Sequence, residues 1–418
     1  MYHEKISTAV LHHNIILVSK EWHQLNSHLG IMIDCGSGFE QAHQHGLAHL
    51  IEHCIFKGTP KRKSYHIINR LDAVGGELNA YTSKEETCYH ASFRNEYYDR
   101  AADLLIDITF NSLFPQAEIE KEKSVIYEEI NSYQDSPAEQ VMDDYDELFY
   151  GKHPLAHPIL GTKDSIANYT TNDLQDFVQQ HYNSANVIIV SVSPLPMAQQ
   201  VIILNKYLEQ CSIPQATAKP KLSKPSYTPK NVTVAKDISQ LHCILGVPAY
   251  AHKQKERLAF MLLNNIIGGP AMNAALNMHI REKNAWVYDI SSNYTSYKNS
   301  GQFSIYYGCD EANHDKVNNA VWKILNSFTT TKLSELKLRE AKNQLSGQIS
   351  LGLDSGISNL FGIGKSQLMN NRVITVNESL LEIDKITASD LMHVANQIFN
   401  QHNFTQLVFT PTQNGNND

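Results

Sequence analysis

Residues 170–194, TTNDLQDFVQQHYNSANVIIVSVSP, return in altered form as residues 387–411, TASDLMHVANQIFNQHNFTQLVFTP. Both stretches begin with a Thr-x-x-Asp-Leu helix start and pass through a polar turn into a β-rich segment that ends at Pro. A similar offset separates two hairpin patterns, 81–93 and 291–307, each followed by an amphipathic helix. This repetition predicts an α+β fold of two similar mixed α/β domains related by internal duplication.

A stretch between the two repeats marks the expected domain boundary. Residues 213–231 hold four prolines with several Lys and Ser and show no apolar periodicity, which is typical of an extended linker. We therefore expect an N-terminal domain over 1–212, the linker, and a C-terminal domain over 232–418. A length of 418 residues suits two domains of about 200 residues each.

Composition narrows the class of protein. A formal net charge of -8 without a basic cluster argues against nucleic acid as a partner. The sequence has no apolar run long enough to cross a bilayer, and residues 1–21 show no export or organelle signal, so we expect a cytoplasmic protein without a membrane partner. The six Cys stand in apolar contexts without Cys-x-x-Cys spacing, which favours reduced, buried thiols.

The apolar segment 46–56 contains the motif His-x-x-Glu-His. On a helix, His49 and His53 stand one turn apart on one face and can share a metal ion, with Glu52 beside them. Cys54 would point about 100° around the helix from His53, so packing is the better interpretation for its thiol. His43 and His45 precede Gly46 in a polar stretch and are expected in a loop rather than at a second metal.

A third ligand must come from another element, because catalytic zinc commonly keeps three protein ligands and one open position. Residues 118–132 predict a helix, and its apolar side is expected to carry Ile119, Val125, Ile126 and Ile130. Glu122 and Glu129 are two turns apart and share a face of this helix. Glu129 is therefore the candidate third ligand.

With these residues the chain resembles the pitrilysin/insulinase family of inverted zinc metallopeptidases, in the short two-domain form of the mitochondrial processing peptidase beta subunit. Glu129 follows His53 by 76 positions within Val-Ile-Tyr-Glu-Glu-Ile, which looks like the third-ligand motif of that family and selects Glu129 over Glu128. The resemblance implies one Zn²⁺ per chain held by His49, His53 and Glu129. It also implies that Glu52 is the catalytic residue, which activates a zinc-bound water.

The same resemblance supplies further site residues. Glu122 matches a second carboxylate of the family, which would orient a ligand imidazole from behind. Residues 71–83 look like the strand with which the family binds extended peptides, so Asn79 and Ala80 are expected to bind substrate by strand addition, although an ordinary hairpin is the alternative. Residues 279–288 resemble a segment whose Arg and Tyr reach the substrate, implying this role for Arg281 and Tyr288.

The second half is expected to lack metal. At the offset of 217, His49, Glu52 and His53 fall on residues without ligand character, namely Ile266, Gly269 and Pro270. Pro270 and Trp286 depart from the family pattern and bear on the shape of the substrate pocket.

The activity implied is zinc-dependent endopeptidase cleavage of oligopeptides or unfolded segments, in a chamber clamped between the two halves. A protease dedicated to one precursor and a non-catalytic subunit of a heteromeric peptidase are the alternatives. Because one chain carries both the metal motif and the Arg281–Tyr288 segment, we expect a homodimer that acts on peptide substrates without a different partner chain.

Overall fold

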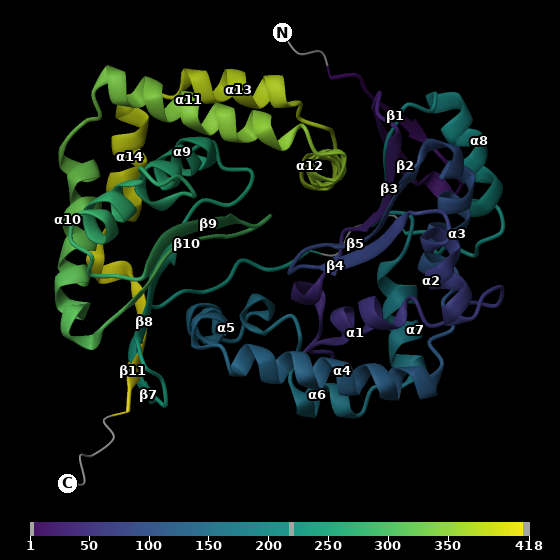
Figure 1. The fold of residues 1–418 in the computed structure, drawn as a ribbon, viewed down its shortest axis with the longest axis horizontal. Helices are drawn as coiled ribbons and strands as arrows, with labels where there is room; N and C mark the ends of the chain where they lie inside the picture. The colour runs from purple at the N-terminus through teal and green to yellow at the C-terminus, as the bar shows by residue number, and fades with distance from the viewer. Residues whose placement is uncertain (1–3, 217–220, 413–418) are drawn as a thin grey trace. The chain divides into compact units, whose positions relative to one another are not determined.

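The computed structural model describes residues 4–216 and 221–412 and holds two sheets (Figure 1). The first sheet has the strand order β1-β2-β6-β3-β5-β4. Its strands are β1 (Ile6–Val10), β2 (Ile16–Glu21), β3 (Asn26–Ile33), β4 (Glu77–Thr82), β5 (Thr87–Arg94) and β6 (Val187–Ser193). Only the β2–β6 pairing in this sheet is parallel.

The second sheet repeats this topology. Its order is β7-β11-β8-β10-β9, with β7 and β11 parallel. The strands are β7 (Asn231–Lys236), β8 (Leu241–Pro248), β9 (Asp289–Ser296), β10 (Gly301–Cys309) and β11 (Thr405–Pro411). Strand for strand it matches the first sheet without β1, which confirms the predicted fold class of two similar mixed α/β units.

The repeated helices begin with the same cap. α7 (Thr171–His181) and α14 (Ala388–Ile398) each start after a Thr, Thr170 and Thr387, whose backbone and side chain are bonded to an Asp three residues later. Such a capping box satisfies N–H groups that the first helical turn leaves unpaired. The Thr-x-x-Asp-Leu pattern therefore predicted both helix starts correctly.

The helices divide between two compact units. The first unit holds α1 (Leu47–Cys54), α2 (Ser64–Asp72), α3 (Tyr98–Asn111), most of α4 (Gln116–Gln134), α6 (Lys163–Ala167), α7, α8 (Met197–Leu208) and α12 (Gly356–Asn370). The second unit holds α5 (Pro137–Tyr150), α9 (Arg257–Gly268), α10 (His314–Thr330), most of α11 (Glu335–Gly352), most of α13 (Val376–Lys385) and α14.

These units differ from the expected contiguous domains at two helices. The first unit comprises the described residues within Met1–Asn131, His157–Leu222 and Ser350–Asn377, and the rest of the described chain forms the second. α12 packs on β2, β3 and β6, whereas α5 packs on β8 and β11. Each unit thus uses one helix from the other half of the sequence, a tertiary packing choice that composition and linker signals do not reveal.

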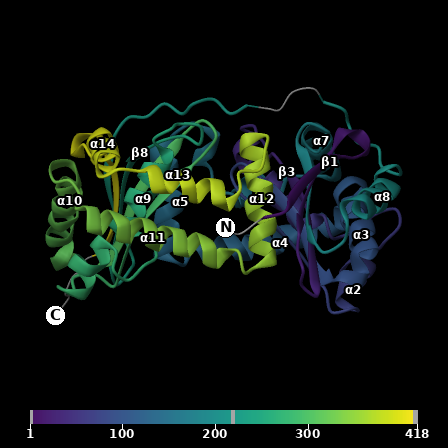
Figure 2. The same cartoon turned by 90° about the horizontal axis from the view of Figure 1, so that it is seen from above.

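The central strands of the first sheet are buried on both faces. Alternate residues point into two apolar clusters, as the period of two in a strand requires. One face meets the helices α1, α3 and α7, and the other meets α12, as Figures 1 and 2 show. The two sets of strand residues are Leu17, Ile31 and Ile189 on the first face and Val18, Met32 and Val190 on the second.

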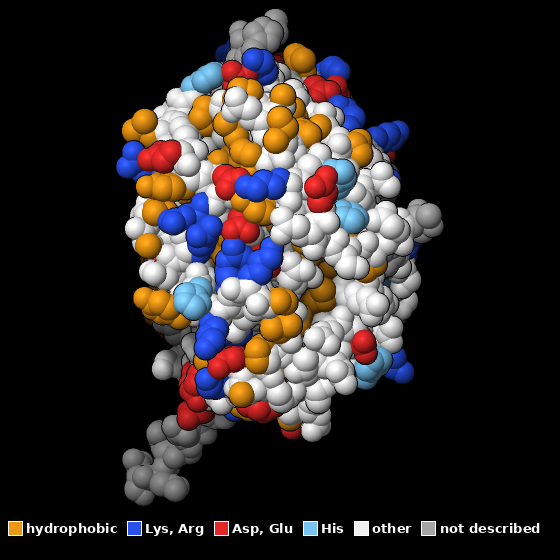
Figure 3. Space-filling view, turned by 90° about the vertical axis from the view of Figure 1, so that its right-hand side faces the viewer, with side chains coloured by type: hydrophobic (Ala, Val, Ile, Leu, Met, Phe, Trp, Pro, Cys, Tyr) orange, Lys and Arg blue, Asp and Glu red, His pale blue; other side chains and the backbone are white. Residues whose placement is uncertain are grey.

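Charges of both signs are interspersed on the face that Figure 3 shows. In the first unit, ion pairs join neighbouring helices: Arg70 of α2 pairs with Asp103 of α3 at 3.1 Å, and Lys206 of α8 pairs with Asp99 of α3 at 3.1 Å. In the part of the chain that the structure describes, no helix has both the length and the apolar character to cross a bilayer. All six Cys are buried and free of disulfides, as expected.

Candidate metal centre

The helix α1 presents His49, Glu52 and His53 along one side because its apolar residues anchor the other. Residues 47, 50, 51 and 54 have the spacing of a single apolar stripe and are fully buried in the core of the first unit. Cys54 belongs to this stripe, so its thiol packs in the core, as predicted. His43 and His45 lie in turns before the helix and do not join a metal-binding group.

The helix α4 brings the carboxylates to α1. Ile119, Ile126 and Ile130 are buried, and Glu122 and Glu129 lie two turns apart on the side of α4 that meets α1. Val125, expected on the apolar side, is 45% exposed, so this expectation was wrong. The three isoleucines alone form a stripe narrow enough to leave Val125 in solvent.

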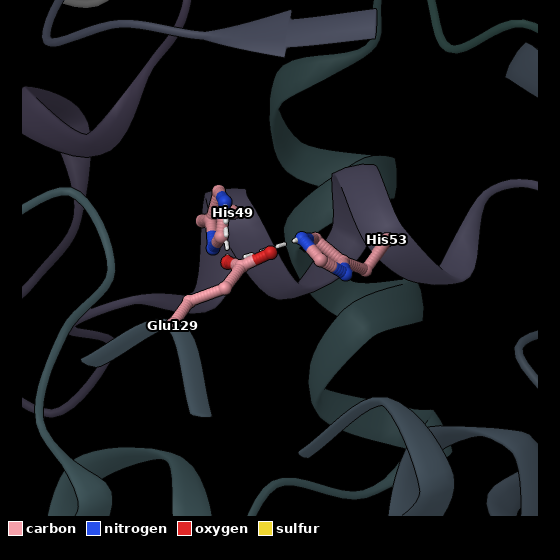
Figure 4. Close-up of side chains that lie close together, drawn as sticks. All are labelled: His49, His53 and Glu129. Carbon is pink, nitrogen blue, oxygen red and sulfur yellow. Dashed lines mark ion pairs between the residues drawn. The ribbon is translucent and has the colours of Figure 1, made fainter. Parts of the chain in front are cut away.

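His49, His53 and Glu129 converge on one point (Figure 4). The Nε2 atom of His49 lies 3.8 Å from Oε2 of Glu129, and Nε2 of His53 lies 3.6 Å from the same oxygen. These distances exceed a hydrogen bond but approach the separation of about 3.3 Å between two ligands on a tetrahedral metal with bonds of about 2.0–2.1 Å. Among residues 4–216 and 221–412 this is the one group with such geometry.

A chain of contacts lies behind His53. Its Nδ1 is 3.1 Å from Oε2 of Glu122, and the ammonium of Lys57 lies 2.6 Å from Oε1 of the same carboxylate. Because Glu122 is an acceptor, Nδ1 carries the hydrogen and the lone pair of Nε2 faces Glu129. The arrangement fixes both the tautomer and the ring direction that metal binding needs.

His49 is held in its neutral form. Burial, together with the nearby His53, lowers the pKa of His49 to about 3. Its buried Nδ1 finds no hydrogen-bond partner among the described residues. A neutral imidazole near pH 7 has a free lone pair on Nε2, as a metal ligand must.

Glu52 combines burial with a free oxygen. Burial raises its pKa and the negative charge of Glu129 adds to the rise, while Thr82 and His53 oppose it. The Oε2 atom is buried and has no hydrogen-bond partner in the described structure, and the hydroxyl of Thr82, close to the same carboxyl group, has none either. A carboxylate with a raised pKa and an unused acceptor is suited to take a proton from a bound molecule.

The donor set fits Zn²⁺. Two imidazole nitrogens and one carboxylate oxygen are the ligands of many catalytic zinc sites, and they leave one coordination position open. The carboxyl group of Glu52 interacts electrostatically with His53 and Glu129, so it lies near this group. The helix α1 supplies the two imidazoles and the helix α4 supplies the carboxylate, so regular secondary structure fixes all three donors.

The candidate substrate strand is an open sheet edge. β4 ends the order of the first sheet and pairs only with β5 there. The N–H of Ala80 donates to Oδ1 of Asn79 at 2.9 Å rather than to β5, so it faces away from the sheet. β4 also contacts α1, which places this edge beside the metal-binding group.

Arg281 and Tyr288 lie in the second unit. Arg281 is exposed in a helical turn (Asn277–Glu282), and Tyr288, 55% exposed, donates to Oδ1 of Asp310 at 3.1 Å. The structure thus brings together His49, Glu52, His53, Glu122 and Glu129 in one unit. The substrate roles of Arg281 and Tyr288 stay predictions.

Two supporting residues were not anticipated from the sequence. Lys57 lies beyond the end of α1. The sequence shows it only as a basic residue four positions after His53, a spacing that by itself does not predict a contact. Glu40 lies upstream of α1, where a lone carboxylate carries no recognisable spacing. Lys57 acts through a tertiary contact with Glu122, whereas Glu40 accepts hydrogen bonds from the start of α1, a few residues further along the chain.

Comparison with known proteins gives the affiliation of the chain. The sequence profile described as insulinase (peptidase family M16) matches residues 15–163, and the profile of the peptidase M16 inactive domain matches residues 168–345. The chain is 30% identical over 387 residues to the uncharacterized zinc protease YmxG of Bacillus subtilis, covering 92% of this chain and 93% of that one. A zinc protease of Rickettsia felis is 31% identical over 373 residues, 89% of each chain.

Solved structures show the same fold. A protease from Helicobacter pylori superposes with a TM-score of 0.91 at 21% identity, covering 98% of this chain and 100% of that one. A peptidase M16 inactive domain from Pseudomonas fluorescens gives a TM-score of 0.90 at 18% identity, covering 98% of both chains. With two family profiles spanning most of its length, the chain belongs to the insulinase family, peptidase family M16.

Proposed function

We propose that this chain is a zinc-dependent endopeptidase that cleaves oligopeptides or unfolded segments. The observation that carries the proposal is the convergence of His49, His53 and Glu129, with the buried carboxyl group of Glu52 in electrostatic interaction with His53 and Glu129. The zinc protease names of its relatives support the coarser part of the proposal, a zinc-dependent peptidase. His49, His53 and Glu129 would hold one Zn²⁺ per chain.

When bound, Zn²⁺ would supply Lewis-acid chemistry, polarising the scissile carbonyl and making water more acidic. Glu52 takes the proton from the attacking water and then delivers it to the leaving amine. The raised pKa of Glu52 favours both transfers, because a base with a pKa nearer neutrality also becomes an effective acid. Glu122, held by Lys57, keeps His53 in the tautomer that binds metal.

The open edge of β4 would bind the substrate backbone as an added strand. The outward N–H of Ala80 is the donor that supports this assignment, and the Asn79 side chain that now accepts it would move aside. Strand addition binds extended chains and leaves folded proteins as poor substrates. Two peptides of the same sequence, one N-methylated at odd residues and one at even residues, should be cleaved at different rates, because only one of them loses the N–H groups that pair with β4. Equal rates for the two peptides would contradict the role of β4.

One chain would suffice for activity. It carries the metal-binding group as well as Arg281 and Tyr288, so we infer a homodimer that needs no different subunit. Sedimentation of the purified chain together with its peptidase assay tests this inference. A monomer would contradict the homodimer, and activity that appears only after addition of a second, different chain would contradict self-sufficiency.

The experiment that tests the proposal is digestion of an unbiased peptide mixture by the zinc-loaded chain, followed by mass spectrometry. An endopeptidase yields internal cleavages that a chelator abolishes and zinc restores. Cleavage confined to terminal residues would contradict the endopeptidase assignment. Absence of any cleavage by a zinc-loaded chain would favour the non-catalytic alternative.

A further inference from the structure

We propose that Glu40 is a positioning residue that caps the metal-binding helix α1 and thereby sets the place of His49. The inference rests on the proposed metal site, but its structural part concerns the polypeptide alone. Glu40 lies directly after a short helical turn (Ser37–Phe39) and is only 3% exposed. Its carboxylate points at the first turn of α1.

The contacts of Glu40 are those of a helix cap. Its Oε2 accepts from the N–H of Gly46 at 3.0 Å, and its Oε1 accepts from the N–H of Ala48 at 2.8 Å. α1 needs this help, because Gly46 in the cap position has no side chain and the first turn contains no acidic residue. A carboxylate at this end also interacts favourably with the helix dipole.

The position of His49 makes the cap important. α1 spans only eight residues, and a helix of two turns has little stability of its own. His49 is the third residue of α1, so its side chain projects from the turn that Glu40 holds. Metal sites tolerate ligand displacements of only about 0.2 Å, so fraying of this turn would weaken binding before the helix was lost.

The surrounding loop is built around the same point. Gly46 has a positive φ of 84°, and a Cβ there would lie 2.7 Å from the carbonyl oxygen of Leu160. The hydroxyl of Tyr169 donates to the carbonyl oxygens of His43 and His45 at 3.2 and 3.0 Å. These contacts fix the chain between Glu40 and α1, so the carboxylate is held in position to accept from its two N–H groups.

Two variants test the role. Glu40→Gln keeps the shape and removes the charge, and Glu40→Ala removes the cap altogether. The matched control is Asp390→Asn, which alters a capping carboxylate at the start of α14 in the second unit. Burial raises the pKa of Glu40 to about 8, opposed by its backbone N–H partners, so measurements are made at pH 8.5.

The first readout is hydrogen exchange in the metal-free protein. The Ala48 amide is the reporter, because Glu40 is its acceptor in the structure. We expect its exchange to accelerate about tenfold in Glu40→Gln and further in Glu40→Ala, and to stay unchanged in Asp390→Asn. Unchanged exchange in both Glu40 variants would overturn the proposal.

The second readout is zinc affinity, measured by competition with a chelator. We expect about tenfold weaker zinc binding in Glu40→Gln, which is the size typical for residues that orient a ligand. The zinc affinity of Asp390→Asn should not change. Zinc binding within twofold of wild type in both Glu40 variants would overturn the positioning role. If the wild type itself bound no zinc, the proposed metal site would fail while the Ala48 amide still decided whether Glu40 caps α1. If Glu40→Ala did not fold, Glu40→Gln alone would decide.

Discussion

The Nδ1 atom of His53 lies 3.1 Å from Oε2 of Glu122, and the opposite nitrogen of the ring faces Glu129. The ring is thus held from behind by one carboxylate and directed toward another. Glu122 is itself paired with Lys57 at 2.6 Å. Lys57, a lysine outside the motif, is therefore linked to the metal-binding imidazole of His53 through Glu122.

Lys57→Met should weaken zinc binding about tenfold, because Glu122 would lose the charge partner that holds it against His53. Chelator competition measures the effect. Lys121→Met is the matched control, since Lys121 is an exposed lysine of α4 that pairs with Glu118 rather than with Glu122. Equal affinities for the two variants would show that Lys57 has no part in orienting His53.

Glu129→Gln should lower zinc affinity by about a hundredfold or more while leaving the far-ultraviolet circular dichroism unchanged, because a ligand is lost without loss of packing. The neighbouring Glu128 is exposed, and Glu128→Gln should bind zinc normally. Metal analysis after dialysis distinguishes the two variants. The reverse order of affinities would mean that Glu128 is the third ligand.

The stability of the metal-free protein should fall as the pH drops below about 6.5. The pKa of His49 falls to about 3 in the folded state from 6.5, so the unfolded state binds more protons between these values and unfolding becomes easier toward low pH. Between pH 7 and pH 5 this residue should account for roughly 2 kcal/mol of lost unfolding free energy.

Urea unfolding in the presence of a chelator measures this dependence. His49→Gln should show a shallower loss of stability over the same pH range. His402→Gln, which alters an exposed imidazole in the second unit, serves as control and should follow the wild type. Parallel curves for wild type and His49→Gln would mean that His49 is not buried as a neutral ring.

Arg281→Ala and Tyr288→Phe should each lower kcat/KM about tenfold to a hundredfold without changing zinc content, if these groups hold the substrate carbonyl. Lys283→Ala removes an exposed cation two residues from Arg281 and is the control. Steady-state kinetics on one peptide identified in the library digest would measure the effect. Wild-type kinetics in both variants would show that Arg281 and Tyr288 do not bind the substrate.

The sequence was sufficient to predict features set by local spacing. The capping boxes before α7 and α14 follow from the Thr-x-x-Asp-Leu pattern, and the shared face of Glu122 and Glu129 follows from helical periodicity. The strand β4 follows from the resemblance of residues 71–83 to the family. The repeat at an offset of 217 then predicted a second unit of the same topology.

Features set by tertiary packing were beyond the sequence. The contact of Lys57 joins two segments that must first be placed, since its partner Glu122 lies on another helix. Glu40 is close in sequence to Gly46 and Ala48, but it stands before a turn and outside the usual capping spacing, so it carries no signal. The exchange of α5 and α12 between the units depends on which sheet face each helix covers. Val125 lies in solvent because three isoleucines already fill the contact of α4 with the core.

The central claim is that Glu52 performs proton transfer at a zinc site built by His49, His53 and Glu129. The most direct measurement compares zinc content and peptide cleavage of Glu52→Gln with those of the wild type in the same preparations. We expect the zinc content of Glu52→Gln to be within twofold of wild type and its rate of cleavage to be lower by about 10²–10⁴-fold. Wild-type cleavage by a zinc-loaded Glu52→Gln protein would contradict the central claim.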